Sequence, residues 1–64
     1  MNMDEKQMRT VEAMETYGGS FVKALARCFR VADQTNFQRL FITFNIYWRE
    51  YEEMAERSHK ISKT

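Results

Sequence analysis

Apolar side chains recur at helical spacing through the second half of the chain. Positions three, four and seven residues apart share one face of a helix. The residues on this stripe are Phe37, Leu40, Phe41, Phe44, Tyr47, Trp48, Tyr51, Met54 and Ala55. We therefore predict one long helix over about 36–57, opened by a capping box between Thr35 and Gln38. Three heptads of mainly aromatic residues are more typical of a bundle core than of a coiled-coil seam.

Two shorter helices are predicted before it, over about 4–17 and 21–33. The only glycines, Gly18 and Gly19, are adjacent, and proline is absent, so this pair is the strongest break. We expect Gly18 to adopt the left-handed conformation that ends a helix and Ser20 to cap the next one. The apolar face of the second helix comprises Phe21, Val22, Leu25, Cys28, Phe29 and Ala32. The expected fold is all-α, with residues 1–64 forming one domain of three helices, the third longest, and a tail that frays from about 58.

Length and composition limit the possible classes of protein. A chain of 64 residues buries only about 60% of its unfolded surface, so its stability is marginal without a partner. Hydrophobic residues at 44% and aromatic residues at 14% exclude a disordered chain. The single cysteine, Cys28, and the absence of a secretory signal favour a cytoplasmic protein. No apolar run approaches the roughly 18 residues of a membrane span.

No constellation of residues supports catalysis or metal binding. Glu56 and His59 have the Glu-x-x-His spacing of metal-binding bundles, but they point away from the aromatic stripe and His59 is the only histidine. We interpret Cys28 as a buried small hydrophobe and Gly18–Ser20 as a turn and cap rather than a phosphate loop. We therefore expect no enzyme activity, no metal and no cofactor.

A basic face on the second helix is the first candidate binding surface. Lys23, Arg27 and Arg30 align there, and Arg39 begins the next helix nearby. The overall charge of +1 gives no general preference for nucleic acid. These four cations are consistent with a solvated face, with an acidic protein partner, or with a nucleic acid or nucleotide. A face made of cations alone suits phosphate or acidic protein better than the reading of bases.

The long helix offers a second candidate surface. Ile42 and Ile46 lie off the main stripe, so either the first helix or a partner protein should cover them. At 1.5 Å per residue, a 12-residue second helix covers only about 18 Å of a third helix about 33 Å long. The end of the stripe with Tyr47, Tyr51 and Met54 is therefore a candidate homodimer contact.

Three segments of the chain resemble a pattern in short open reading frames of bacteriophages and prophages. They are Tyr17–Leu25 (YGGSFVKAL), Ala32-Asp33 with Asn36, and Tyr47–Met54 (YWREYEEM). The resemblance covers about residues 17–55 and implies an uncharacterised small helical protein, without carrying across any functional residue. Such proteins often have proline before the Tyr-Trp segment, where this chain has Asn45-Ile46. That difference favours a continuous third helix.

Two functions follow as hypotheses. The first is a phage-type accessory protein that binds and modulates a host or phage protein, for example as an anti-defence inhibitor. The second is a small binder of nucleic acid or nucleotides that uses Lys23, Arg27, Arg30 and Arg39. Salt dependence separates the two, because phosphate binding weakens steeply as salt increases and an aromatic interface does not.

Overall fold

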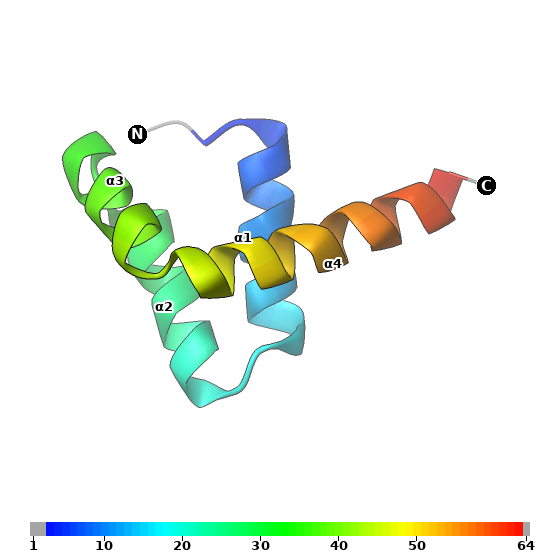
Figure 1. The fold of residues 1–64 in the computed structure, drawn as a ribbon, viewed down its shortest axis with the longest axis horizontal. Coiled ribbons are helices and arrows are strands. Elements are labelled where there is room, and N and C mark those ends of the chain that lie inside the picture. Colours follow the sequence, from blue (N-terminus) through cyan, green and yellow to red (C-terminus); the bar gives the residue numbers. More distant parts are fainter. Residues whose placement is uncertain (1–2, 64) are drawn as a thin grey trace.

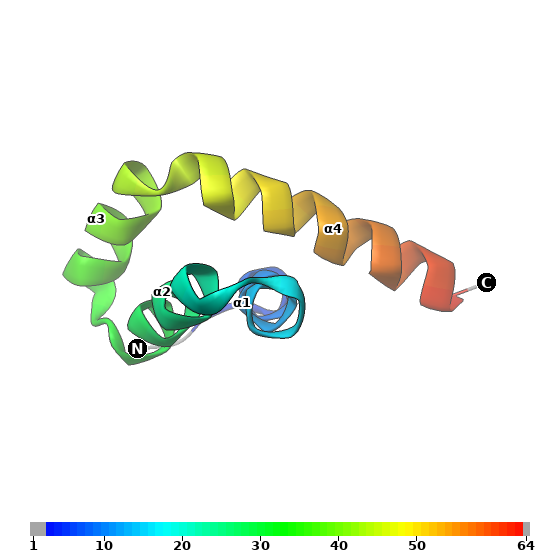
Figure 2. The same ribbon diagram turned by 90° about the horizontal axis from the view of Figure 1, so that it is seen from below.

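The described part of the chain is all-α, as predicted, but it forms four helices rather than three. A computed structural model describes the backbone of residues 3–63 and the side chains of residues 3–58. The helices are α1 (Glu5–Tyr17), α2 (Ser20–Val31), α3 (Gln34–Thr43) and α4 (Asn45–Lys63). The first two form a hairpin, and α3 and α4 form a bent arm that arches over it (Figures 1 and 2). The end of α4 extends past α1 and is helical to Lys63, where fraying from about 58 was expected.

The turn between α1 and α2 differs from the prediction. Gly18 has φ −77° and ψ 157°, so it is extended and not left-handed. Glycine is needed here for space: a Cβ on Gly18 would lie 2.5 Å from the carbonyl oxygen of Met14 and 2.5 Å from Val22 Cγ1. Ser20 is already the first residue of α2, and Gly19 occupies the N-cap position without a side-chain hydrogen bond.

The predicted long helix is interrupted at Phe44, which has φ −112° and ψ 36°. The interruption loses little hydrogen bonding, since the Phe44 N–H donates to Leu40 O at 2.8 Å and the Trp48 N–H to Phe44 O at 3.0 Å. In a straight helix, residues 37 and 48 would be about 16 Å apart along the axis. The bend instead brings the rings of Phe37 and Trp48 to 5.7 Å between centroids. A single helix over 36–57 was therefore wrong because both rings pack into one core.

The cap of α3 was also misplaced. The side chain of Asp33 accepts a hydrogen bond from the backbone N–H of Asn36 at 2.8 Å, so Asp33 is the N-cap and the helix begins at Gln34. Thr35 and Gln38 lie inside the helix and form no capping box. An aspartate at this position also places negative charge at the positive end of the helix dipole.

All four helices contribute to one buried cluster. Its members are Val11, Met14, Val22, Leu25, Ala26, Phe29, Ala32, Phe37 and Trp48. Phe29 lies at its centre, 5.2 Å from Phe37 and 4.9 Å from Trp48 between ring centroids. The expected burial of Cys28 and Phe21 is contradicted, because both side chains are exposed. The apolar arc of α2 is wider than the face that α1 and the arm can cover.

Helix α1 packs against both α2 and α4. Across the contact with α4, Lys6 Nζ lies 3.7 Å from Glu52 Oε2, and Arg9 Nη2 lies 3.4 Å from Glu56 Oε2. Helix α1 thus covers the inner side of α4 and leaves Ile42 and Ile46 exposed. In residues 3–63, no helix combines the length and apolar character needed to cross a membrane.

Candidate partner-binding surface

An open groove separates α2 from α3. These two helices are joined by only Ala32 and Asp33, and α3 packs chiefly against α4 instead of lying along α2. The groove has a volume of about 370 Å³ and is lined by Cys28, Val31, Ala32, Asn36, Arg39, Leu40 and Thr43. Val31 is 79% exposed. Most of the lining is apolar, and none of it is acidic.

The exposed side of α2 that borders this groove is apolar along its whole length. Phe21, Ala24, Cys28 and Val31 are three or four residues apart, so they share one face of the helix. All four are exposed, and we refer to them as the α2 stripe. This surface was not predicted from the sequence, because the helical spacing of Phe21 and Cys28 indicated core positions. The signal in the sequence that could have indicated it is the width of the apolar arc of α2, which is larger than one buried face requires.

An aromatic patch lies at the start of the α2 stripe. Phe21 meets Phe44 and Tyr47 from the junction of α3 and α4, with ring centroids 6.1 and 5.5 Å away. Phe21 is 55% exposed, Phe44 is half-buried, and Tyr47 is partly exposed. The bend at Phe44 creates this patch because it turns the aromatic stripe toward the beginning of α2.

The four cations of the predicted basic face are divided between two places. Lys23, Arg27 and Arg30 surround a hollow of about 470 Å³ together with Glu15 and Ala24. Arg39 instead lines the groove between α2 and α3. The structure therefore brings three of the four together and places the fourth on the other side of the α2 stripe.

Arg30 is neutralised by a carboxylate that sequence analysis did not assign to it. Its Nη2 donates to Glu15 Oε1 at 2.9 Å, and its Nε donates to Glu15 Oε2. This bidentate hydrogen bond lowers the pKa of Glu15 and raises that of Arg30. The two residues are 15 positions apart across the α1–α2 turn, so no local spacing rule indicates the pair.

The remaining cations of α2 and α3 are unpaired. Within the part of the chain that the structure describes, Lys23, Arg27 and Arg39 have no ion-pair partner. Residues 20–43 carry four cations and one carboxylate, whereas the rest of the chain carries six and eight. The α2–α3 side is therefore positive, and the α1–α4 side is negative and largely ion-paired.

The residues of the second predicted surface also separate. Ile42 and Ile46 are 70% and 81% exposed, so neither α1 nor any other described segment covers them. Tyr47 belongs to the aromatic patch, and Tyr51 and Met54 are half-buried within the chain. Tyr51 packs against the core cluster. Less of the proposed dimer contact is accessible than the sequence suggests.

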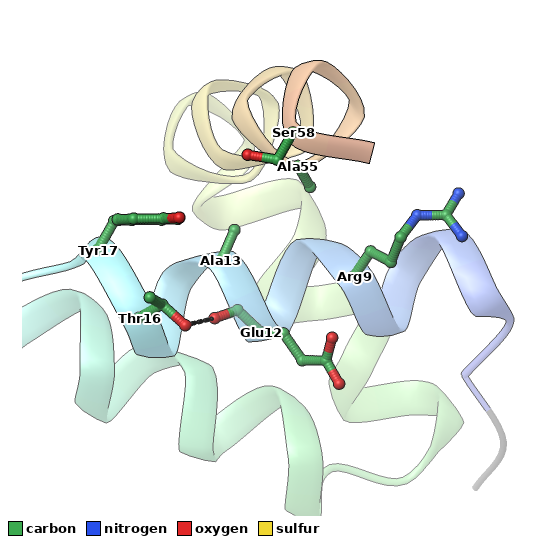
Figure 3. A pocket seen from close by; sticks show the side chains of 7 residues that line it. All are labelled: Arg9, Glu12, Ala13, Thr16, Tyr17, Ala55 and Ser58. Carbon is green, nitrogen blue, oxygen red and sulfur yellow. Dashed lines mark hydrogen bonds between the residues drawn. The ribbon is translucent and has the colours of Figure 1, made fainter. Parts of the chain in front are cut away.

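A further hollow of about 260 Å³ lies between α1 and α4 (Figure 3). Ala13 and Ala55 form its floor, Arg9 and Tyr17 lie at opposite ends, and the Glu12 carboxylate points away. Thr16 Oγ1 donates to the backbone oxygen of Glu12 at 2.8 Å, and Arg9 is engaged by Glu56.

The Glu-x-x-His candidate gains no support from the geometry. Glu56 binds Arg9, and the side chain of His59 lies outside the described residues. Among the side chains that are described, no three from histidine, cysteine, aspartate and glutamate gather as metal ligands would.

Comparisons with known proteins do not assign the chain to a family. No protein-family model and no curated protein matches the sequence, and no solved structure matches the fold.

Proposed function

We propose that this chain is a protein-binding module, acting as a phage-type accessory protein that modulates a host or phage protein. The supporting observation is the exposed apolar surface formed by the α2 stripe and the aromatic patch. Single exposed hydrophobic residues are common on soluble proteins, but continuous apolar surfaces mark binding sites. Such a small domain would act by covering a functional surface of its partner, as an anti-defence inhibitor would.

Nucleic acid or nucleotide binding is the second candidate, favoured by the unpaired cations Lys23 and Arg27. Two features weigh against it. Glu15 shares their hollow and would repel a phosphate, and Arg39 lies in a different groove. Each phosphate contact by lysine or arginine makes binding steeply salt-dependent, and the apolar surface offers no such contact.

Photo-crosslinking tests the protein-binding proposal. A photoreactive amino acid replaces Ala24 in the exposed α2 stripe, and a matched sample carries it at Glu50 on exposed α4. We expect nuclease-treated lysate of the host to give discrete protein adducts from position 24 that persist at moderate salt and are absent from position 50. Adducts that disappear with nuclease would favour the second candidate. No adduct, or the same adducts from both positions, would refute protein binding through this surface.

Self-association is a separate part of the proposal. A two-fold contact through Tyr47, Tyr51 and Met54 would bury the accessible part of the aromatic patch, because a closed dimer uses the same patch twice. Sedimentation at micromolar concentration should then give a dimer, and Tyr47→Asp should dissociate it. A monomer of 7.7 kDa would rule this contact out and leave the patch for another protein.

A further inference from the structure

We infer that the groove between α2 and α3 binds an acidic amphipathic helix of another protein, a conclusion that rests on the proposed protein-binding function. The groove is lined by aliphatic side chains and by the unpaired Arg39, and the unpaired Arg27 lies across the α2 stripe in the neighbouring hollow. An amphipathic helix binds such a groove by inserting apolar residues spaced three and four apart while its polar side meets the rim.

The floor of the groove suits aliphatic side chains. Val31 and Leu40 line it from opposite helices, together with Cys28 from α2 and Thr43 from α3. Leu40 is half-buried and the other three are exposed. A partner helix would remove these groups from water, and buried apolar area is the main source of affinity at the centre of an interface.

The charged side chains in and beside the groove favour a partner of negative charge. Arg39 lines the groove from α3, whereas Arg27 lies on the other side of the α2 stripe, in the hollow that Glu15 also lines. Neither has an ion-pair partner among the described residues. The nearest carboxylate in sequence is Asp33, whose side chain already accepts a hydrogen bond from the Asn36 backbone. Glutamate side chains along a bound helix would give Arg39 a partner in the groove, and complementary charge increases association rate and selectivity.

A second copy of this chain fits the groove less well. A two-fold contact through the groove would bring the groove of one copy, with Arg39, against the equally positive groove of the other copy, where no carboxylate lines the contact. Alternatively, the groove of one copy could bind a different surface of a second copy. The groove of the second copy would then stay open, so this contact leads to chains of molecules rather than closed dimers. The chemistry of the groove is therefore better matched by a different protein.

A peptide-binding experiment tests the inference with defined probes. The first probe is a capped 20-residue peptide with leucine at helical i, i+3, i+4 and i+7 spacing and glutamate at most other positions. The control peptide has lysine in place of every glutamate. Binding is measured by fluorescence anisotropy and by protection of the single thiol, Cys28, from an aromatic disulfide reagent. We expect the glutamate peptide to bind and protect Cys28, and the lysine peptide to do neither.

Matched variants separate a specific rim from general charge attraction. Arg39→Glu should weaken glutamate-peptide binding about 10-fold, whereas Arg49→Glu makes the same charge change on exposed α4 and should leave binding unchanged. Val31→Asp should abolish binding while circular dichroism shows an intact helical fold. Equal binding of both peptides, equal loss in the two arginine variants, or unprotected Cys28 would overturn the inference. If position 24 still crosslinks to protein in that case, protein binding stands and only the acidic-helix assignment fails.

Discussion

The protein has two groups of aromatic rings with opposite exposure, although both arise from the same helices. Phe29, Phe37 and Trp48 are buried and meet at the centre of the core. Phe21, Phe44 and Tyr47 meet at the surface, where α2 begins and the arm bends. Each group joins α2 to the arm, so ring contacts alone do not distinguish core from interface. Exposure to water does distinguish them. The buried rings stabilise the fold, and the exposed rings belong to the proposed binding surface.

Truncation of a buried ring should have the largest effect on stability. Phe29→Ala removes a ring with 0% exposure and should lower the free energy of unfolding by about 3–5 kcal/mol. Phe21→Ala, in the same helix, should cost less than about 1 kcal/mol because the ring is already half in water. Urea denaturation followed by circular dichroism measures both. Similar losses for the two variants would show that the surface rings also belong to the core.

Phe44→Ala should fall between these extremes. The aromatic stripe in the sequence places Phe44 near the middle of a continuous core helix, which predicts a loss of about 3–5 kcal/mol. In the structure the ring is half-buried at the bend, so we expect about 1–2 kcal/mol, since the transferred area is roughly halved. A loss of stability as large as that of Phe29→Ala, in the same urea experiment, would show that Phe44 is a core residue.

Gly18→Ala tests the close packing at the α1–α2 turn. This packing orients α2, with Val22 pointing inward and Phe21 outward. The added Cβ would clash with the Met14 carbonyl oxygen and with Val22, so we expect a loss of about 1–3 kcal/mol, as for overpacked cores. Gly19→Ser is the matched control, because a Cβ there meets nothing within 4 Å and the hydroxyl can cap α2. It should gain about 0.5–1 kcal/mol. Thermal unfolding of the two variants should therefore shift in opposite directions.

The smallest expected effect concerns the Glu15–Arg30 pair, which ties α1 to α2 away from both ring groups. Arg30 lowers the pKa of Glu15 below its ordinary value of 4.5. The stabilisation is fully present above pH 4.5 and is lost as the pH falls through the lower pKa of the folded state. Both side chains are partly exposed, so solvent reduces the effect. Stability curves of wild type and Glu15→Gln should converge below that pKa, and a constant difference at all pH values would contradict this cause.

The sequence predicted the features that depend on local chemistry. The all-α class, the first two helices and the buried positions of Phe29, Phe37 and Trp48 all followed from helical spacing. The break at Phe44 did not, because it results from packing between Trp48 and Phe37. The presence of Asn45-Ile46 favoured a continuous helix, yet tertiary packing interrupts it here without proline.

The candidate surface was predictable only in part. Lys23 and Arg27 are exposed, as their positions on the helix suggested, whereas Ile46 was expected to be covered by the first helix or a partner and is exposed in the chain. The groove depends on where α3 turns away from α2, which the periodicity of neither helix shows. Glu15 could not be matched to Arg30 because the α1–α2 turn sets the distance between them. Spacing rules describe neighbours on one helix, whereas the groove and the Glu15–Arg30 pair each join side chains from two helices.

The contact between α1 and α4 determines when the protein can fold during its synthesis. Val11 and Met14 are completely buried only because the last helix crosses over the first, and Trp48 completes the core that α1 and α2 begin. As the chain leaves the ribosome, the hairpin of α1 and α2 emerges with the apolar faces of both helices uncovered. Contacts between residues distant in sequence cannot form until the later partner is available. The core therefore closes only after α4 has been translated, and until then the uncovered apolar faces of α1 and α2 are prone to aggregation.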